Sequence, residues 1–461
     1  MSESVPVRPR LLSLAWPIFV EQALRMLIGT VDIFMVSHVS DGAVAALNVG
    51  NQVVIFFLLV FNFIGVGASV VVTHCLGARD PAGAGRIARS AVSLNLWLGV
   101  AASLFVFTFA GPLLRLLQLP AELEGYALPF LTLMGGTLML ESVSIALAGV
   151  LRAHTHTRDT MLVLAGQNLL NLAGNAVLLF GLFGFPAMGV TGVALASVAA
   201  RVAGLIALWI LVRRRIGFRF DGADLFRLPR DHMRRILRIG LPSVGENICW
   251  WTAFMTITAF TSRLGAEPLA TQSYVMQILW LVIICTVSLG LGNEIVTGHL
   301  VGGGAFEEAY HELRRNVRLG ITVAMALICA IAVFAPQILA VFSDNPSVIA
   351  GGAFLLRLSV LLEPGRVMNV LVVFAMRATG DARYPLKLGV LVMWGVWVPL
   401  AWLLGLKLGW GLPGIWAAMI VDEWTRGLLN LRRWNSRRWL VHAERSRREA
   451  LAGRSAPSPT S

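Results

Sequence analysis

The stretch AWPIFVEQ at residues 15–22 returns later in the chain as GLPSVGEN at residues 240–247. An offset of 225 residues places the proline and the glutamate of one stretch on those of the other without a gap. Self-similarity at a long, fixed offset indicates a duplicated structural unit. The chain is therefore expected to contain two copies of one fold.

The same offset aligns further identical residues, of types that chance similarity between Leu- and Ala-rich segments would not favour. They are Pro17/Pro242, Glu21/Glu246, Gln52/Gln277, Gly65/Gly290, Gly67/Gly292, His74/His299, Gly77/Gly302, Arg89/Arg314, Phe109/Phe334, Arg152/Arg377 and Arg158/Arg383. Each copy holds about six apolar runs, an even number, so both copies enter a membrane from the same side. Such a parallel repeat has a pseudo-two-fold axis along the membrane normal and is typical of secondary transporters.

The composition indicates that these apolar runs lie in a membrane. Of the 461 residues, 57% are apolar and only 14% are charged, and the mean hydropathy is +0.74. A single soluble core stops growing near ~250–300 residues, so an excess of this size has no soluble core to fill. The composition excludes an ordinary cytosolic enzyme, a disordered chain and a coiled coil, and it favours an α-helical membrane protein.

Twelve apolar runs are long enough to span a bilayer. They are residues 13–38, 48–75, 90–111, 126–147, 161–181, 187–212, 236–263, 270–298, 317–341, 348–374, 386–406 and 412–431. The predicted fold is an all-α polytopic membrane protein. Its twelve transmembrane helices form two six-helix lobes, related by the parallel repeat, around a central cavity.

The runs divide the chain into five segments. These are a cytoplasmic N-terminal segment (1–12), an N-lobe (13–212), a cytoplasmic inter-lobe linker (213–235), a C-lobe (236–432) and a basic cytoplasmic tail (433–461). The tail is expected to be disordered. Its arginines are expected to contact anionic lipid, and a solvated tail without a role is the alternative.

The charges fix the predicted orientation. The chain has 38 Lys and Arg against 25 Asp and Glu, which gives a net charge of +13. Thirty of the 38 basic residues fall on one side of the predicted membrane, three on the other and five within spans. The positive-inside rule therefore places both termini in the cytoplasm. This asymmetry accounts for the basic composition without any nucleic acid.

Four oxygen-bearing side chains of the N-lobe are expected to meet in one layer. Asp32 lies in the first span, Asn171 and Asn175 share one face of the fifth, and Ser197 lies in the sixth. Placing an ionisable side chain inside the membrane costs at least ~2.5–3.5 kcal/mol, so such a residue is a functional candidate by default. A Na⁺ ion at Asp32, Asn171 and Asn175, or a proton on the carboxylate, would suit this set. Alternatively, the asparagines only hold helices together.

A second group of polar and charged side chains lies in the C-lobe. Glu363, Arg366 and Asn369 follow nearly one face of the tenth span. Asp422 precedes Arg426 by four residues on the twelfth. Pairs at these spacings lower the cost of burial, so a charge network that fixes the lobe is one interpretation. A proton-linked or substrate-facing network is the other.

Two more charges within spans are candidates for the transport path. Glu246 has no basic residue at a helical spacing, whereas its repeat mate Glu21 has Arg25 four residues later. Arg201, in the sixth span, is expected either to line the cavity or to pair with an acid.

Several stretches resemble the multidrug and toxic compound extrusion (MATE) family. They are LAWPIFVEQALRMLIGTVDIFMVSHVSDGAVAALNVGNQV (14–53), GASVVVTHCLGARDPAGA (67–84), RATGDARYPL (377–386) and, as a weaker copy, LRAHTHTRDTM (151–161). EPGRVMN (363–369) and VDEWTRGLLNLRRWNSRRW (421–439) resemble a bacterial branch of that family. The resemblance covers roughly residues 11–440.

The resemblance implies a twelve-helix pump with two lobes and a central cavity. Members of the family export bulky, often cationic, organic compounds in exchange for H⁺ or Na⁺. The first-span aspartate, here Asp32, is the coupling carboxylate. The fifth and sixth spans supply an Asn, then often an Asp, and a Thr, where this chain has Asn171, Asn175 and Ser197. Asn175 in place of an aspartate leaves one charge in the site instead of two.

The expected function is secondary active multidrug efflux by alternating access. The protein is expected to act as a monomer in a bacterial inner membrane. The expected partners are small organic substrates and the lipid bilayer, with no cofactor and no catalytic residues. The alternative is a flippase for a lipid-linked precursor, from the same superfamily. An enzyme is disfavoured, because no GxxxxGK[ST], HExxH or GxSxG pattern occurs. The four cysteines lie far apart in apolar runs, without metal-ligand spacing.

Overall fold

The computed structural model describes residues 10–38, 40–218 and 220–454, and within these ranges it contains helices and no strand. The described residues form two compact units. The N-unit comprises Val20–Thr73 and Pro81–Leu241. The C-unit comprises the described residues of Met1–Phe19, His74–Asp80 and Pro242–Ser461. Each unit contains one copy of the repeat with small exchanges at its edges.

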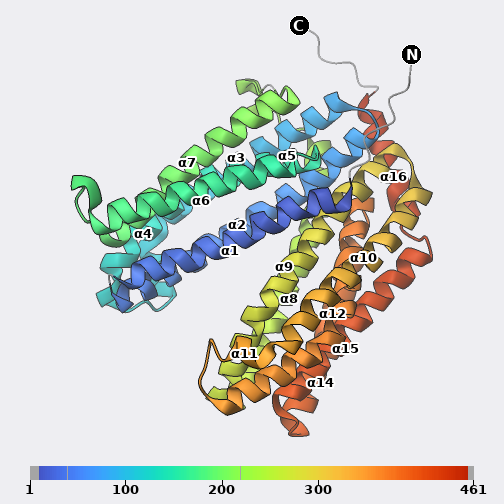
Figure 1. Ribbon diagram of the computed structural model, residues 1–461. Helices are drawn as coiled ribbons and strands as arrows, with labels where there is room; N and C mark the ends of the chain where they lie inside the picture. The colour runs from blue at the N-terminus through green and yellow to red at the C-terminus, as the bar shows by residue number, and fades with distance from the viewer. Residues whose placement is uncertain (1–9, 39, 219, 455–461) are drawn as a thin grey trace. The chain divides into compact units, whose positions relative to one another are not determined.

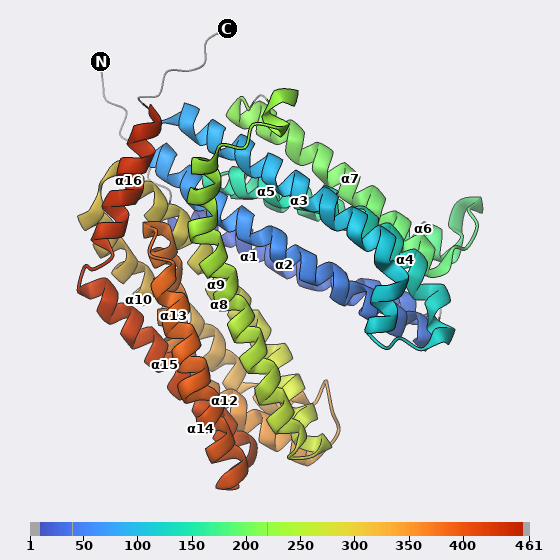
Figure 2. The same cartoon turned by 180° about the vertical axis from the view of Figure 1, so that it is seen from behind.

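The helices of the N-unit pack side by side (Figures 1 and 2). They are most of α1 (Leu11–Ser37) and α2 (Asp41–Gly77), then α3 (Pro81–Leu116), α4 (Glu124–Gly136), α5 (Leu138–Ala153), α6 (Thr157–Phe180) and α7 (Gly189–Ile216). The main packing partners are α3 with α4 and α5, and α6 with α7. The short 3-10 helices η1 (Ala121–Leu123) and η2 (Leu182–Gly184) lie in its connections.

The C-unit is built around α12 (Pro346–Thr379), which contacts α9, α10 and α15. Its other helices are most of α8 (Arg230–Ser262), α9 (Ala266–Gly303), α10 (Phe306–Val333), α11 (Ala335–Leu339), α13 (Arg383–Val392), α14 (Val398–Ala401), α15 (Gly411–Asn435) and α16 (Leu440–Arg454). Two π-helical segments, η4 (Met393–Trp397) and η5 (Trp402–Lys407), flank α14. Pro399 in α14 has no N–H group, so the regular hydrogen-bond ladder is interrupted here.

The long apolar helices follow the predicted runs. Of the described helices, nine are long and apolar enough to cross a membrane, and the pair Ala121–Gly136 and Leu138–Ala153, bent by 44°, makes ten if it is counted as one broken span. The helices α8 and α15, with 33 and 25 residues, are long enough but carry more charge. Together these elements match the twelve predicted runs, which confirms the predicted all-α fold.

The duplication reappears in the irregular points of the backbone. Phe109 is a non-helical residue inside α3, and its mate Phe334 is the non-helical residue between α10 and α11. Thr155 and its mate Gly380 both have a positive φ, at 65° and 91°, just after a helix ends. Only a few per cent of non-Gly residues adopt this conformation. Both copies therefore break their helices at the same places.

The edges of the two units differ from the predicted lobe boundaries at 212 and 236. The first residues of α1 and the end of α2 belong to the C-unit, whereas the start of α8 up to Leu241 belongs to the N-unit. Close backbone approach at small residues fixes these exchanged ends. In the N-unit, a Cβ on Gly240 would lie 2.0 Å from the carbonyl oxygen of Phe63. In the C-unit, a Cβ on Gly77 would lie 2.1 Å from that of His299.

Gly77→Ala and Gly302→Ala are both expected to destabilise the protein. The added Cβ on Gly302 would lie 2.1 Å from the carbonyl oxygen of His74, which mirrors the contact at Gly77. Overpacking of this kind costs about 1–3 kcal/mol, and here the obstacle is backbone that cannot rotate away. Thermal unfolding in detergent measures the effect. Gly85→Ala is the control, because nothing lies within 4 Å of its Cβ position, and equal stability of all three variants would contradict the expectation.

The inter-lobe linker is docked on α3 of the N-unit. It contains the 3-10 helix η3 (Gly222–Leu225) and leads directly into α8. Ser93 Oγ donates to the carbonyl of Asp224 at 2.9 Å, and Trp97 Nε1 donates to that of Leu225 at 2.8 Å. Ser90 Oγ and His232 Nδ1 are hydrogen-bonded at 2.8 Å. Burial, and then the positive charge of Arg235 and Arg86, lower the pKa of His232, so the neutral imidazole is favoured here.

The predicted disorder of the tail 433–461 is wrong for residues up to 454. The helix α15 continues to Asn435, and α16 follows, with Ala443 and Ala450 buried. The rings of Trp434 and Trp439 stack at 4.3 Å. Ala443, Ser446 and Ala450, three and four positions apart, form a buried face of small residues on α16, which the many arginines obscured in the composition. Residues 455–461 lie outside the described part of the chain.

Candidate functional site

The four N-lobe candidates form one hydrogen-bonded row inside the N-unit. Asn175 Nδ2 donates to Asp32 Oδ1 at 2.7 Å and to Asn171 Oδ1 at 3.1 Å. Asn171 Nδ2 donates to Ser197 Oγ at 2.8 Å. The side chains come from α1, α6 and α7, because the four-residue spacing of the asparagines puts them on one face of α6. The structure thus places all four residues together, as expected from their similar positions along the predicted spans.

This row contains one ionisable group. Asn175 is fully buried, and Asn171 and Ser197 are nearly so, whereas Asp32 is half-buried. No Lys or Arg within the described residues forms an ion pair with Asp32. The amide hydrogen bond from Asn175 is therefore its main stabilising contact. A carboxylate without a cationic partner in such a setting can exchange a proton or bind a cation.

The orientation of Asn175 bears on which cation fits. Its amide nitrogen faces Asp32, while its oxygen Oδ1 is buried without a hydrogen-bond partner. A metal ion shared by the two side chains would need amide oxygen toward the carboxylate, because cations such as Na⁺ are bound by oxygen. As arranged, the row leaves the second oxygen of Asp32 available to carry a proton. Across the described residues, no three His, Cys, Asp or Glu side chains converge on a metal site.

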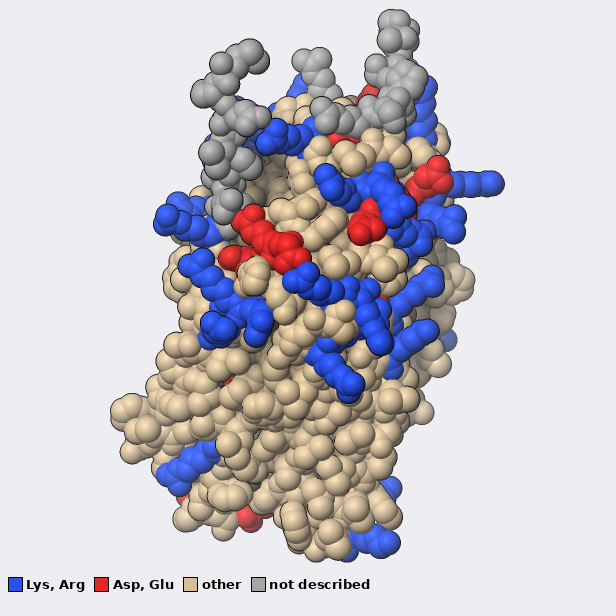
Figure 3. Space-filling view, turned by 90° about the vertical axis from the view of Figure 1, so that its right-hand side faces the viewer, with Lys and Arg blue, Asp and Glu red and all other residues tan. Residues whose placement is uncertain are grey.

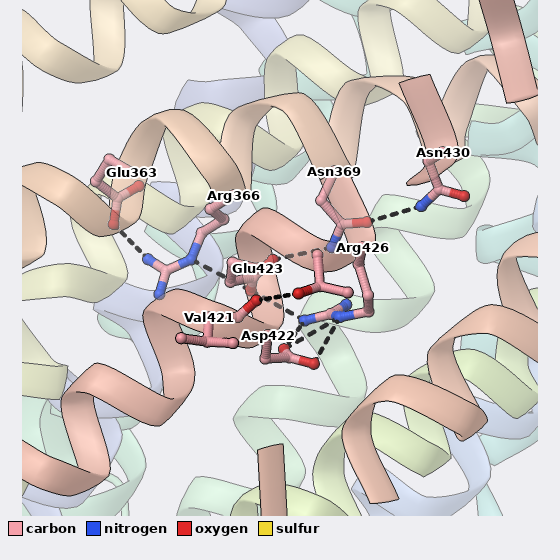
Figure 4. Close-up of polar contacts among 9 residues, drawn as sticks. Glu363, Arg366, Asn369, Val421, Asp422, Glu423, Arg426 and Asn430 are labelled. Atoms are coloured by element: carbon pink, nitrogen blue, oxygen red, sulfur yellow. Dashed lines mark hydrogen bonds and ion pairs between the residues drawn. The ribbon is translucent and has the colours of Figure 1, made fainter. Parts of the chain in front are cut away.

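The C-lobe candidates form a continuous network between α12 and α15 (Figure 4). Arg366 pairs with Glu363 at 2.5 Å and lies 3.8 Å from Glu423. Arg426 pairs with Asp422 at 2.5 Å and with Glu423 at 3.2 Å. The carboxylate of Glu423 thus lies between the two guanidinium groups and joins the two helices.

Amide groups extend the same network. Asn369 Nδ2 donates to Glu423 at 2.9 Å, and Asn430 Nδ2 donates to Asn369 Oδ1 at 3.0 Å. Trp424 Nε1 donates to the carbonyl of Leu361 at 2.8 Å, one turn before Pro364 in α12. The spacings predicted the pairs within each helix. They did not predict the contacts between helices, so the roles of Glu423 and Asn430 were missed, although Asn430 follows Arg426 by one helical turn.

The network holds three carboxylates against two guanidinium groups. All five side chains are buried, and Glu363 is fully so. One oxygen of Glu363, Oε2, is buried without a hydrogen-bond partner. The desolvation of charges is offset here by short ion pairs, and removing one member leaves its partner uncompensated. The network is therefore a strong local constraint on how α12 and α15 pack.

The two repeat-related glutamates make the same ion pair in their own units. Glu21 pairs with Arg152 at 3.0 Å, and Glu246 pairs with Arg377 at 3.0 Å. Each pair is separated by 131 residues and joins the first helix of a repeat to a later one. Its local sequence suggested that Glu246 is an unpaired charge, but the structure pairs it with Arg377. The duplication of the contact favours a structural role for both glutamates.

Arg201 also has an acidic partner. Its guanidinium lies 3.7 Å from Glu141 and donates to the carbonyl of Met134 at 3.2 Å. The repeat offset equates Arg201 with Arg426 and Glu141 with Arg366. Both copies thus keep a buried arginine at this position, while the residue at the other position is Glu141 in the first copy and Arg366 in the second. Of the two roles expected for Arg201, lining the cavity or pairing with an acid, the structure supports pairing with an acid.

Glu246→Gln is expected to lower the thermal stability while drug export is retained. The substitution removes the charge that faces Arg377, whose side chain is only 8% exposed. Losing a partner of a partly buried charged hydrogen bond costs about 1–3 kcal/mol. The measurements are thermal unfolding and drug resistance of cells, with the exposed Glu267→Gln as control. Loss of resistance at unchanged stability would instead place Glu246 in the transport path.

Comparison with known proteins gives consistent matches along the chain. The family model MatE matches residues 17–177 and 242–403, once in each repeat. The chain is 37% identical over 430 residues to the uncharacterized transporter YisQ of Bacillus subtilis, a match that covers 93% of this chain and 94% of that protein. It is 28% identical over 461 residues to the multidrug resistance protein PmpM of Pseudomonas aeruginosa, at 95% and 94% coverage.

Solved structures share the fold at low sequence identity. A crystal structure of MATE in the bent conformation has a TM-score of 0.84 and 19% identity, and the match covers 96% of each chain. The outward-facing conformation of a multidrug resistance MATE family transporter has a TM-score of 0.81 and 19% identity, over 98% of this chain and all of that chain. These likenesses show the fold.

Proposed function

Since this chain belongs to the MatE family of membrane transporters, we propose that it is a multidrug efflux antiporter that exports bulky, often cationic, organic compounds. The chain is a transporter and not an enzyme. The relative PmpM of Pseudomonas aeruginosa is named a multidrug resistance protein, and it supports this substrate class. Export is coupled to an inward cation flux through alternating inward- and outward-facing states.

The observation that carries the proposal is the row Asp32–Asn175–Asn171–Ser197. It presents one carboxylate without a cationic partner among the described residues, inside the part of the chain predicted to span the membrane. We assign the coupling role to Asp32 and positioning roles to the three neutral residues. The proton is the proposed coupling ion, because the amide nitrogen of Asn175, and not its oxygen, faces the carboxylate.

The proposed setting is a bacterial inner membrane, with both termini in the cytoplasm and the protein as a monomer. The asymmetric distribution of Lys and Arg supports this orientation. On the face drawn in Figure 3, basic side chains gather toward one end, and a broad band nearly without charge lies beyond them. Such a band is suited to contact with lipid tails.

Expression in a drug-hypersensitive bacterial strain tests the export function. Cells with the wild-type protein are expected to resist ethidium and norfloxacin above the level of empty vector, and to accumulate less ethidium. Equal sensitivity at confirmed membrane expression would overturn the proposal for these drugs. Accumulation of a lipid-linked precursor after deletion of the gene, without a change in drug sensitivity, would instead support a flippase.

A further inference from the structure

We propose that the C-unit binds the phosphate-bearing headgroup of an anionic phospholipid in a pocket between α13 and the end of α15. The inference rests on the orientation proposed above, which puts this end of the unit in the cytoplasmic leaflet. That leaflet carries the anionic lipids of a cell membrane. Neither the export function nor the row around Asp32 requires this pocket.

The pocket is of a size and composition that suit a small anionic group. Its volume is about 310 Å³, which lies at the lower end of the range of about 300–1,000 Å³ found for ligand sites. Its lining residues are Tyr384 from α13, Leu429, Arg432 and Arg433 from α15, and Ser436 and Arg438 just beyond α15. No acidic side chain lines it.

Two of the three arginines have no acidic partner. Arg433 Nε donates to Asp381 at 2.7 Å, and its guanidinium stacks on the Tyr384 ring at 4.2 Å. The guanidinium groups of Arg432 and Arg438 are exposed, and the described residues provide no ion pair for either. The pocket therefore keeps two uncompensated positive charges. Guanidinium groups bind phosphate with paired hydrogen bonds, so this charge fits a phosphate group.

Exposed apolar side chains continue from the pocket along both helices. On α13, Leu391 lies two turns from Tyr384 on the same face and is 71% exposed. On α15, Leu428 is 52% exposed and lies one turn before Arg432. A free phosphate ion would not contact this apolar surface. A phospholipid would place its headgroup against the arginines and its acyl chains along these leucines.

Native mass spectrometry of the purified full-length protein tests the proposal, with phosphatidylglycerol, phosphatidylcholine and glycerol 3-phosphate as probes. Wild type is expected to retain phosphatidylglycerol in preference to phosphatidylcholine, and to bind glycerol 3-phosphate weakly. Arg432→Gln/Arg438→Gln is expected to weaken phosphatidylglycerol binding by at least about 25-fold, because it removes both charge-assisted contacts to the phosphate. Arg432→Lys/Arg438→Lys keeps the charges but loses the paired hydrogen bonds, so binding between that of wild type and the Gln pair is expected.

Arg315→Gln/Arg318→Gln is the matched control. Both residues are exposed arginines of α10 in the same unit, outside the pocket, and neither has an acidic partner in the described chain. This pair is expected to change binding less than twofold. Equal losses in the two Gln pairs would overturn the site, as would equal retention of phosphatidylcholine. Tight binding of glycerol 3-phosphate would overturn the lipid assignment and point to a soluble phosphate compound. Drug export by wild type is measured separately, so failure of either proposal can be recognised.

Discussion

Asp32→Asn is expected to abolish drug export, down to the level of empty vector, while the protein still accumulates in the membrane. Asn has nearly the shape of Asp and can keep a hydrogen bond to Asn175, which donates to Asp32 at 2.7 Å. It cannot release and rebind a proton at physiological pH. The fold therefore has little reason to change, whereas the coupling step is lost. Resistance to ethidium or norfloxacin, with protein quantified in membranes, measures the effect.

Asp41→Asn is the matched control for this prediction. Asp41 is an exposed residue at the start of α2, outside the row around Asp32, and the same substitution there should leave resistance unchanged. Asp32→Glu keeps the ionisable group but displaces it by one methylene, so partial export is expected. Full resistance in the Asn variant would rule out Asp32 as the coupling residue.

Arg426→Met is expected to destabilise the C-unit strongly, by about 3–5 kcal/mol, because it leaves buried carboxylates uncompensated. Asp422 and Glu423 both pair with this arginine, at 2.5 and 3.2 Å. The variant should show a lower unfolding temperature in detergent and less protein in the membrane. The exposed Arg315→Met serves as control and should behave like wild type.

A second variant separates the two interpretations of the C-unit network. Arg426→Met/Asp422→Asn removes one charge of each sign, so it should recover part of the lost stability if the network is structural. Recovered stability together with recovered export would support the structural interpretation. A stable Arg426→Met protein that cannot export drugs would contradict it and would place the network in the transport machinery.

Most of the fold could be predicted from the sequence, because the apolar runs are long and the pattern occurs twice. Twelve apolar runs gave the helices, and the 225-residue offset gave the two copies. The same offset equates breaks that were not foreseen, such as Phe109 and Phe334. Depth along each span was enough to group Asp32 with Asn171, Asn175 and Ser197, because helices that cross one bilayer share a common scale of depth.

Contacts between distant helices could not be predicted from local spacing. The pairs Glu21–Arg152 and Glu246–Arg377 each join residues that are 131 positions apart, far beyond any helical period. Arg201 and Glu141 lie on different helices as well. The offset did contain one usable signal, since Glu21/Glu246 and Arg152/Arg377 are both identical in the two copies. In α16, the charged residues obscured a buried face of small residues, so its helix was missed.

Transport by purified protein in proteoliposomes tests the coupling role of Asp32 most directly. Ethidium movement is followed under an imposed pH gradient or an imposed Na⁺ gradient, with wild type and Asp32→Asn reconstituted at equal density. The pH gradient is expected to drive transport by wild type, the Na⁺ gradient is not, and neither is expected to drive transport by Asp32→Asn. Transport by Asp32→Asn at the wild-type rate, or wild-type transport driven by Na⁺ alone, would contradict this expectation.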